Sequence, residues 1–266
     1  MALNRATLKT RSISAAIFVV VMLAGLLINQ WTFLLLFTII HFGCWVEFQR
    51  IIGQIDEDYK SITPFHRYGI MVAGLCFLLY FTNNEFRFGD FMLHSIGWWL
   101  GLLMAFLLPM TEILFAGNIS LKNIGYSAVG LIYISLSCGL MIDLLRFPSL
   151  PFQSAPILPA VIIACMWIND TMAYIVGSLI GKTPLTAVSP KKTWEGTIGG
   201  IILTVTVIMV IGGYTTLLRD FHFIHWIMIS LIASVAGTFG DLFESKLKRL
   251  AGIKDSGNMM AGHGGF

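Results

Sequence analysis

Two aspartates stand inside long apolar segments of the sequence, where a charged side chain is costly. Asp170 follows Trp167-Ile168-Asn169, and Asp241 follows Gly240 near the end of a second apolar run. A carboxylate within a membrane-spanning helix costs roughly 3 kcal/mol or more to insert, so it needs a polar environment or a partner. Helical spacing places Asp170 on one face with Ala173 and Gly177, and small residues let another helix approach closely. We therefore expect Asp170 to face the packed interior.

Asp241 belongs to a polar stripe at helical spacing. The stripe consists of Ser234, Gly237, Asp241, Ser245 and Lys248. Two inward-facing aspartates on different helices suit a hard cation, and Mg²⁺ prefers carboxylate oxygens together with substrate phosphates. Proton-coupled transporters place acidic residues in the same way, so the pair alone leaves both functions open.

A polar loop, residues 181–196, separates the two apolar segments. Ser189-Pro190 predicts a helix start, with serine as the N-cap and proline at the first helical position. Free amides at that helix start, with Lys191 and Lys192 beside them, would bind an anion. The alternative is that these lysines serve only to orient the protein in a membrane.

The C-terminal segment gathers cations, an acid and glycines. Lys248, Arg249 and Lys254 precede Asp255, and His263 is followed by Gly264-Gly265. Cations, a carboxylate and glycines that admit a ligand close to the backbone are suited to polyphosphate and metal. A solvated basic tail is the alternative.

These blocks together resemble a known family, the phosphatidate cytidylyltransferases or CDP-diacylglycerol synthases. The resemblance rests on three blocks over roughly the C-terminal hundred residues, and the last block is the most specific. The first block consists of Asn169, Asp170, Thr171, Ala173, Tyr174 and Gly177, and the second of Ser189, Pro190, Lys191, Lys192, Thr193, Glu195 and Gly196. The third consists of Ser245, Leu247, Lys248, Arg249, Lys254, Asp255, Gly257, His263, Gly264, Gly265 and Phe266. Met260 and Ala261 depart from the usual pattern.

The resemblance implies a reaction, a cofactor and site residues. CTP and phosphatidic acid would become CDP-diacylglycerol and pyrophosphate, with Mg²⁺ required and a homodimer expected. The catalytic residues would be Asp241, Asp170, Lys192, Lys248 and His263. The substrates would contact Asn169, Lys182, Ser189, Lys191, Lys192, Glu195, Lys248, Arg249, Lys254, His263 and Gly264. The metal ligands would be Asp241 first, then Asp170 and Asp255.

The elements that must position these residues are membrane-spanning helices. Spanning a bilayer takes about 20 apolar residues, and the sequence predicts an all-α, polytopic bundle of about eight spans. They are two helices within 13–46 that turn at Asn29-Gln30-Trp31, then about 68–81, 91–110, 124–145, 158–181, 196–217 and 225–242. Residues 1–155 would be a scaffold with lipid access, and residues 156–266 a catalytic core. The family pattern predicts continuation past Phe266, with an acidic residue two positions on and a ninth span.

The charges support this topology. With the N-terminus in the cytoplasm, the inner segments hold fourteen of the 17 lysines and arginines, and the outer ones only Arg87, Arg146 and Arg219. This is the positive-inside bias. We expect a multi-pass protein of a bacterial inner membrane, with the N-terminus and the catalytic loops in the cytoplasm.

Composition excludes some classes of function and leaves two rivals. The chain is 56% hydrophobic and 12% charged, against roughly 25% charged in soluble domains, and its net charge of +3 gives little reason to expect nucleic acid. The four cysteines show no metal-ligand spacing. The rivals are a CTP-dependent kinase of a polyprenol or other lipid alcohol, and a cation- or proton-coupled transporter using Asp170 and Asp241.

Overall fold

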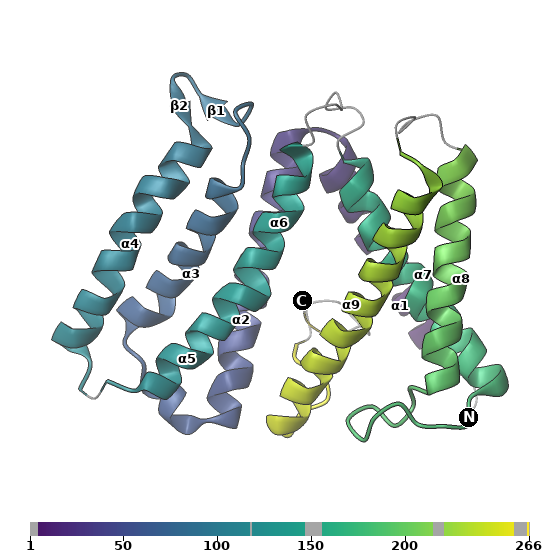
Figure 1. Cartoon of the computed structure of the whole chain (residues 1–266). Helices are drawn as coiled ribbons and strands as arrows, with labels where there is room; N and C mark the ends of the chain where they lie inside the picture. Colours follow the sequence, from purple (N-terminus) through teal and green to yellow (C-terminus); the bar gives the residue numbers. More distant parts are fainter. Residues whose placement is uncertain (1–4, 118, 147–155, 215–220, 258–264, 266) are drawn as a thin grey trace. The chain divides into compact units, whose positions relative to one another are not determined.

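The computed structural model describes residues 5–117, 119–146, 156–214, 221–257 and 265, and these residues are almost entirely helical (Figure 1). They form two compact units. The first comprises residues 1–155 together with 251–266, and the second comprises residues 156–250. The predicted all-α, polytopic fold is confirmed, because each predicted span coincides with a helical segment.

The first unit contains the N-terminal helices and one short hairpin. Its elements are α1 (Arg5–Leu27), α2 (Gln30–Ile55), the 3₁₀ segment η1 (Glu57–Ser61), α3 (Pro64–Tyr80), β1 (Arg87–Phe88), β2 (Phe91–Met92), α4 (Leu93–Phe115), α5 (Leu121–Gly130), the π-helical η2 (Leu131–Leu136), α6 (Ser137–Asp143) and η3 (Leu144–Arg146). The second unit contains α7 (Ile157–Ile180), α8 (Trp194–Tyr214) and α9 (Phe223–Leu250).

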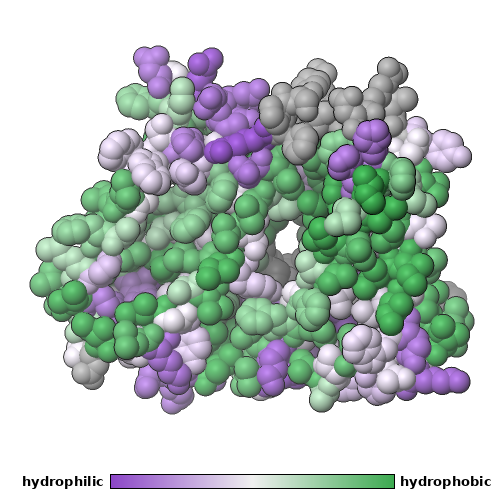
Figure 2. Space-filling view, in the orientation of Figure 1, coloured by the Kyte–Doolittle hydropathy of each residue, from purple (hydrophilic) through white to green (hydrophobic). Residues whose placement is uncertain are grey.

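Six of the helical segments in the described residues are long and apolar enough to cross a membrane. They are Gln30–Ile55, Leu93–Phe115, Leu121–Arg146, Ile157–Ile180, Trp194–Tyr214 and Phe223–Leu250. The other two predicted spans are shorter: the described apolar part of α1 is Ile13–Leu27, and α3 has 17 residues. Hydrophobic side chains cover the flanks of the helices in each unit, and hydrophilic ones gather toward the helix ends (Figure 2).

The turn predicted at residues 29–31 is confirmed. Asn29 is the N-cap of α2, and its side chain accepts hydrogen bonds from the amides of Trp31 and Thr32, both at 2.9 Å. Thr32 closes a capping box by accepting from the Asn29 amide at 3.2 Å. This arrangement satisfies amides that a helix start leaves without partners. The hairpin of β1 and β2, which turns through Gly89 at a φ of +58°, was not predicted.

Buried polar pairs bind the first unit together. Trp45 donates to Ser135 Oγ at 2.9 Å, and the same hydroxyl lies 3.0 Å from His41 Nε2. Eight residues earlier, in α5, Ser127 contacts His66 Nε2 at 2.7 Å and Tyr59 at 3.3 Å. Hydroxyls buried at this depth need partners, and these partners fix how α5, η2 and α6 face α2 and α3.

An ion pair joins the loop after α2 to the start of α5. Lys122 Nζ lies 2.6 Å from the carboxylate of Asp56, which also caps η1 through the amide of Asp58 at 3.2 Å. The hydrogen bond from Lys122 lowers the pKa of the Asp56 carboxyl.

The second unit depends on close contact between α7 and α8, which glycines permit. A Cβ at Gly200 would lie 2.8 Å from the Cβ and 2.9 Å from the backbone nitrogen of Ala173, so something would have to shift. A Cβ at Gly196 would lie 2.9 Å from Cα of Gly177. The small-residue face predicted for Ala173 and Gly177 is therefore confirmed as the face on which α8 packs.

We expect Gly200→Ala to lower the thermal stability of the detergent-solubilised protein, because overpacking typically costs roughly 1–3 kcal/mol. The matched control is Gly213→Ala on the same helix, where a Cβ meets nothing within 4 Å. There the alanine should be neutral or stabilising, by up to about 1 kcal/mol of helix propensity. Equal melting temperatures for the two variants would contradict the close α7–α8 contact.

Candidate functional site

A pocket of about 410 Å³ lies within the second unit and contains both membrane aspartates. Its walls come from α7, α8, α9 and the end of the loop between α7 and α8. The lining residues are Asn169, Asp170, Ala173, Tyr174, Gly177, Ser178, Ser189, Lys191, Lys192, Thr193, Thr197, Thr238 and Asp241. Six of the predicted site residues are among them: Asn169, Asp170, Ser189, Lys191, Lys192 and Asp241.

Asn169 lines this pocket and has a buried acceptor that is not in use. The residue is 3% exposed, and its Nδ2 donates to Thr238 Oγ1 at 3.2 Å. Thr238 in turn donates to the carbonyl of Ser234 at 2.9 Å. Within the described residues Oδ1 of Asn169 is buried without a hydrogen-bond partner. Burying an acceptor without a hydrogen-bond partner costs free energy. A ligand that offers this oxygen a hydrogen bond or a cation would recover that cost and bind more tightly.

The two aspartates differ in their surroundings. Asp241 forms an ion pair with Lys192, and both side chains are partly exposed. Asp170 is exposed on the pocket wall, and no hydrogen bond or ion pair joins its carboxylate to another residue of the described part of the chain. No cluster of three or more His, Cys, Asp and Glu side chains that could hold a metal ion occurs among the described residues.

These residues nevertheless fit a hard cation. Asp170 and Asp241 supply carboxylate oxygens to the pocket, and Asn169, whose Oδ1 is unpaired within the described residues, lines the same pocket. Mg²⁺ is usually held by one or two carboxylates plus substrate phosphates, and it keeps several of its water ligands. A set of two carboxylates and an amide oxygen meets that requirement.

The loop that carries the lysines folds back on itself. Leu185 N donates to Lys192 O at 2.7 Å, and Trp194 N donates to Thr183 O at 3.0 Å. Glu195, in the first turn of α8, accepts from the amides of Lys182 and Thr183 at 3.2 Å and from the Thr183 hydroxyl at 2.9 Å. Both ends of the loop are thus attached to the start of α8.

The predicted helix start at Ser189-Pro190 is wrong. The helix begins at Trp194, and Thr193 accepts the cap hydrogen bond from Gly196 N at 3.1 Å. Ser189 instead begins a turn that the amide of Lys192 closes on its carbonyl at 3.0 Å. Proline fits that turn equally well, because its φ suits the second position of a β-turn as well as the first position of a helix.

Four other predicted site residues of this unit lie outside the pocket lining. The carboxylate of Glu195 is engaged with the loop amides, one of which belongs to Lys182. Lys248 pairs with Glu244 at 2.5 Å, two turns beyond Asp241 on α9, and Arg249 is exposed near the end of that helix.

The remaining predicted residues fall in the C-terminal segment. Lys254 and Asp255 belong to the first unit, where the neighbouring Ser256 carbonyl accepts a hydrogen bond from Arg50 of α2. His263 and Gly264 lie outside the described residues. Their roles stay predictions.

The structure adds polar residues to the pocket that the sequence analysis did not select. These are Ser178, Thr193, Thr197 and Thr238, of which Thr193 belongs to the family pattern but has no site role predicted from it. Thr238 had a usable signal, because it follows Ser234 by four residues and precedes Asp241 by three on the same stripe. Ser178 and Thr197 are single hydroxyl residues, which the sequence alone does not distinguish from structural ones.

Comparison with known proteins gives a consistent set of relatives. A model of the cytidylyltransferase family matches residues 9–266. The phosphatidate cytidylyltransferase of Staphylococcus saprophyticus is 28% identical over 268 residues, covering 97% of this chain and 92% of that protein. That of Bacillus subtilis is 34% identical over 62% of this chain and 60% of its own length. The chloroplastic phosphatidate cytidylyltransferase 4 of Arabidopsis thaliana is 42% identical over 99 residues, which make up 37% of this chain but only 25% of the plant protein.

Proposed function

We propose that this chain, which belongs to the cytidylyltransferase family, converts CTP and phosphatidate to CDP-diacylglycerol and pyrophosphate. The observation that carries the proposal is that Asp170, Asp241, Lys191 and Lys192 all line the same pocket. Carboxylates for a cation and ammonium groups for phosphates are what a reaction between two polyanions requires. The relatives from Staphylococcus saprophyticus and Bacillus subtilis bear the name of this activity.

The reaction is an in-line displacement at phosphorus. A non-bridging oxygen of the phosphatidate phosphate forms a bond to the α-phosphorus of CTP, and the bond from that phosphorus to the α,β-bridging oxygen breaks. Pyrophosphate leaves with the electron pair, and no protein group needs to be covalently modified. The protein's task is to align the two phosphates and to stabilise their charge.

Asp170, Asp241 and Oδ1 of Asn169 would hold Mg²⁺, which when bound would neutralise charge on the phosphates. Lys192 is already in contact with Asp241. Its ammonium group would therefore be within reach of phosphate oxygens bound beside that carboxylate. Lys191 lines the same wall. The hydrogen bonds from the loop to Glu195 limit the movement of both lysines before substrate arrives. The lysines would then bind phosphate in the positions they already occupy, without a closing movement of the loop.

The chain is a multi-pass membrane protein by its helices and its relatives. We further propose a bacterial inner membrane, with the lysine-bearing loop in the cytoplasm where CTP is present. The positive-inside bias of the sequence supports this orientation. A homodimer, expected from the family resemblance, is part of the same proposal.

The test is incubation of the purified chain with Mg²⁺, phosphatidate and CTP carrying a label in its α-phosphate, followed by lipid extraction. We expect the label to enter the lipid fraction as CDP-diacylglycerol and pyrophosphate to be released in equal amount. Parallel reactions with CTP labelled in the γ-phosphate should leave the lipid unlabelled. Transfer of the γ-label to a lipid alcohol would establish the kinase instead, and no nucleotide-dependent labelling in either arm would favour a transporter.

A further inference from the structure

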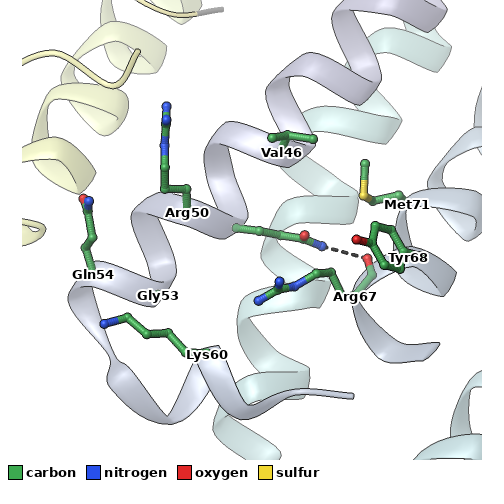
Figure 3. A pocket seen from close by; sticks show the side chains of 9 residues that line it. Val46, Arg50, Gly53, Gln54, Lys60, Arg67, Tyr68 and Met71 are labelled. Carbon is green, nitrogen blue, oxygen red and sulfur yellow. Dashed lines mark hydrogen bonds between the residues drawn. The ribbon is translucent and has the colours of Figure 1, made fainter. Parts of the chain in front are cut away.

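A second pocket lies in the first unit, where α2 ends and α3 begins. Its volume is about 470 Å³. Its lining comes from the last turns of α2, from η1 and from the first two turns of α3: Val46, Gln49, Arg50, Gly53, Gln54, Lys60, Arg67, Tyr68 and Met71 (Figure 3). None of these residues was selected as a site residue from the sequence.

The charge of this lining is one-sided. It contains Arg50, Lys60 and Arg67, together with two glutamine amides, and no aspartate or glutamate. Two of the cations already have partners: Arg50 donates to the carbonyl of Ser256, and Lys60 pairs with Glu57 at 3.2 Å on the exposed rim. The stem of Lys60 passes close to Gly53, where a Cβ would lie 3.3 Å from Lys60 Cγ.

Arg67 differs from the other two. Its Nε is buried and has no hydrogen-bond partner, and no ion pair joins its guanidinium to another residue of the described segments. Its backbone is fixed, since Gln49 donates to the Arg67 carbonyl at 2.9 Å, and Figure 3 shows the side chain extending from there toward α2. Burying a guanidinium nitrogen without a partner costs free energy unless an anion accepts its hydrogen bond. Its planar donors suit phosphate oxygens.

The pocket also has an apolar wall that runs into the membrane. Val46 precedes Arg50 by one turn of α2, and Met71 follows Arg67 by one turn of α3. Helix α2 is long and apolar enough to cross a membrane, so we infer that its end lies at the surface and that both residues lie deeper in the bilayer than the cations. Val46 is 60% exposed, so its side chain is available to a neighbour from the lipid phase. A ligand that fits has an anionic head at the surface and hydrocarbon beneath it.

We propose that this pocket binds the phosphate of an anionic glycerophospholipid, with Arg67 as the main contact and the acyl chains along Val46 and Met71. Clusters of basic side chains at the membrane surface hold such headgroups. The site lies wholly within the first unit, and the catalytic pocket lies wholly within the second. The inference therefore goes beyond the proposed reaction and does not depend on it.

The experiment uses native mass spectrometry of the purified full chain in detergent, with added phosphatidylglycerol or phosphatidylcholine. Phosphatidylglycerol is anionic but has no phosphomonoester, so it cannot act as the nucleophile of the proposed reaction. We expect one phosphatidylglycerol to be retained in preference to phosphatidylcholine. Arg67→Gln should weaken that retention about tenfold, as loss of a charge-assisted contact to phosphate predicts. Lys60→Gln, a change on the exposed rim, should weaken it less.

The matched control is Arg87→Gln, which removes an exposed cation beyond the other end of α3 and should leave retention unchanged. Thermal melting of each variant confirms that it is folded. Equal retention of the two lipids by the unmodified protein, or equal retention by Arg67→Gln and Arg87→Gln, would overturn the proposal. A third arm adds inorganic phosphate or CTP: displacement of the lipid at equimolar concentration would assign the pocket to a soluble phosphate instead. Turnover is measured in none of these arms, so failure of the proposed reaction would leave their outcome intact.

Discussion

Asp241→Asn is expected to reduce the rate of CDP-diacylglycerol formation at least about a thousandfold, equivalent to about 4 kcal/mol of transition-state stabilisation. The asparagine keeps the size of the side chain and one oxygen, but it removes the negative charge that would hold Mg²⁺ and that attracts Lys192. Expression and helicity should be nearly unchanged, because Asp241 is partly exposed on the pocket wall. The measurement is initial rate with labelled CTP across a range of Mg²⁺ concentrations.

The matched control is Glu244→Gln. It removes a carboxylate from the next turn of α9, where Glu244 pairs with Lys248 outside the pocket. We expect this variant to retain most of its activity and an unchanged Mg²⁺ dependence. Near-normal turnover by pure Asp241→Asn protein would refute the assignment of Asp241 as a metal ligand.

The second large effect is expected from Lys192→Ala, which should lower kcat/KM by about a hundredfold or more. Removing one positioned donor from a developing oxyanion typically costs 10²–10³-fold in rate. Lys192 is the cation in direct contact with Asp241, so its loss removes phosphate stabilisation at the centre of the pocket. Substrate concentration curves for CTP measure the effect.

Lys246→Ala provides the comparison for Lys192→Ala. Lys246 is exposed on α9 and does not line the pocket, so its removal should change the rate by less than about twofold, as expected for surface charges. A different outcome for Lys192→Ala would also be informative. If the ion pair merely masks Asp241, the variant will bind Mg²⁺ more tightly and work faster, and Lys192 would lose its assigned role.

The helices could be predicted because hydropathy and helix length report directly on the membrane. Each apolar run of the sequence became a helix, and the turn at Asn29 followed from its capping chemistry. The hairpin of β1 and β2 could not be predicted this way. Its strands have two residues each, too few for the alternation that identifies a strand.

The site was predictable to the extent that it rests on side chains within helices. Spacing on α7 and α9 predicts that Asp170 and Asp241 face inward, and the structure puts both in one pocket, although Asp170 is exposed on its wall rather than packed in the interior. The loop was less predictable because its shape depends on hydrogen bonds between residues that are seven to thirteen positions apart. Nothing local distinguishes Ser189 from Thr193 as the cap, and the partners of Glu195 appear only when Thr183 is brought beside it.

The residues of the second pocket were missed for a related reason. Arg50, Lys60 and Arg67 were counted only as charges that orient the chain in the membrane. That count gives the number of cations near a surface, but not which of them lacks a partner. The missing information is the burial of Arg67 Nε, which depends on how α3 packs on the end of α2.

The π-helical segment η2 has a consequence for how the length of this span can vary. In an unbroken α-helix the eight-residue interval from Ser127 to Ser135 would leave their directions about 80° apart, whereas seven residues bring them within about 20°. The wider turn of a π segment absorbs the additional residue, so both serines reach their buried partners. Loss of one residue between 131 and 134 would leave a regular helix with both contacts kept. The same deletion before Ser127 in α5, or within α6, would rotate one flank away from its partners, so single-residue length differences among relatives should concentrate between Ser127 and Ser135.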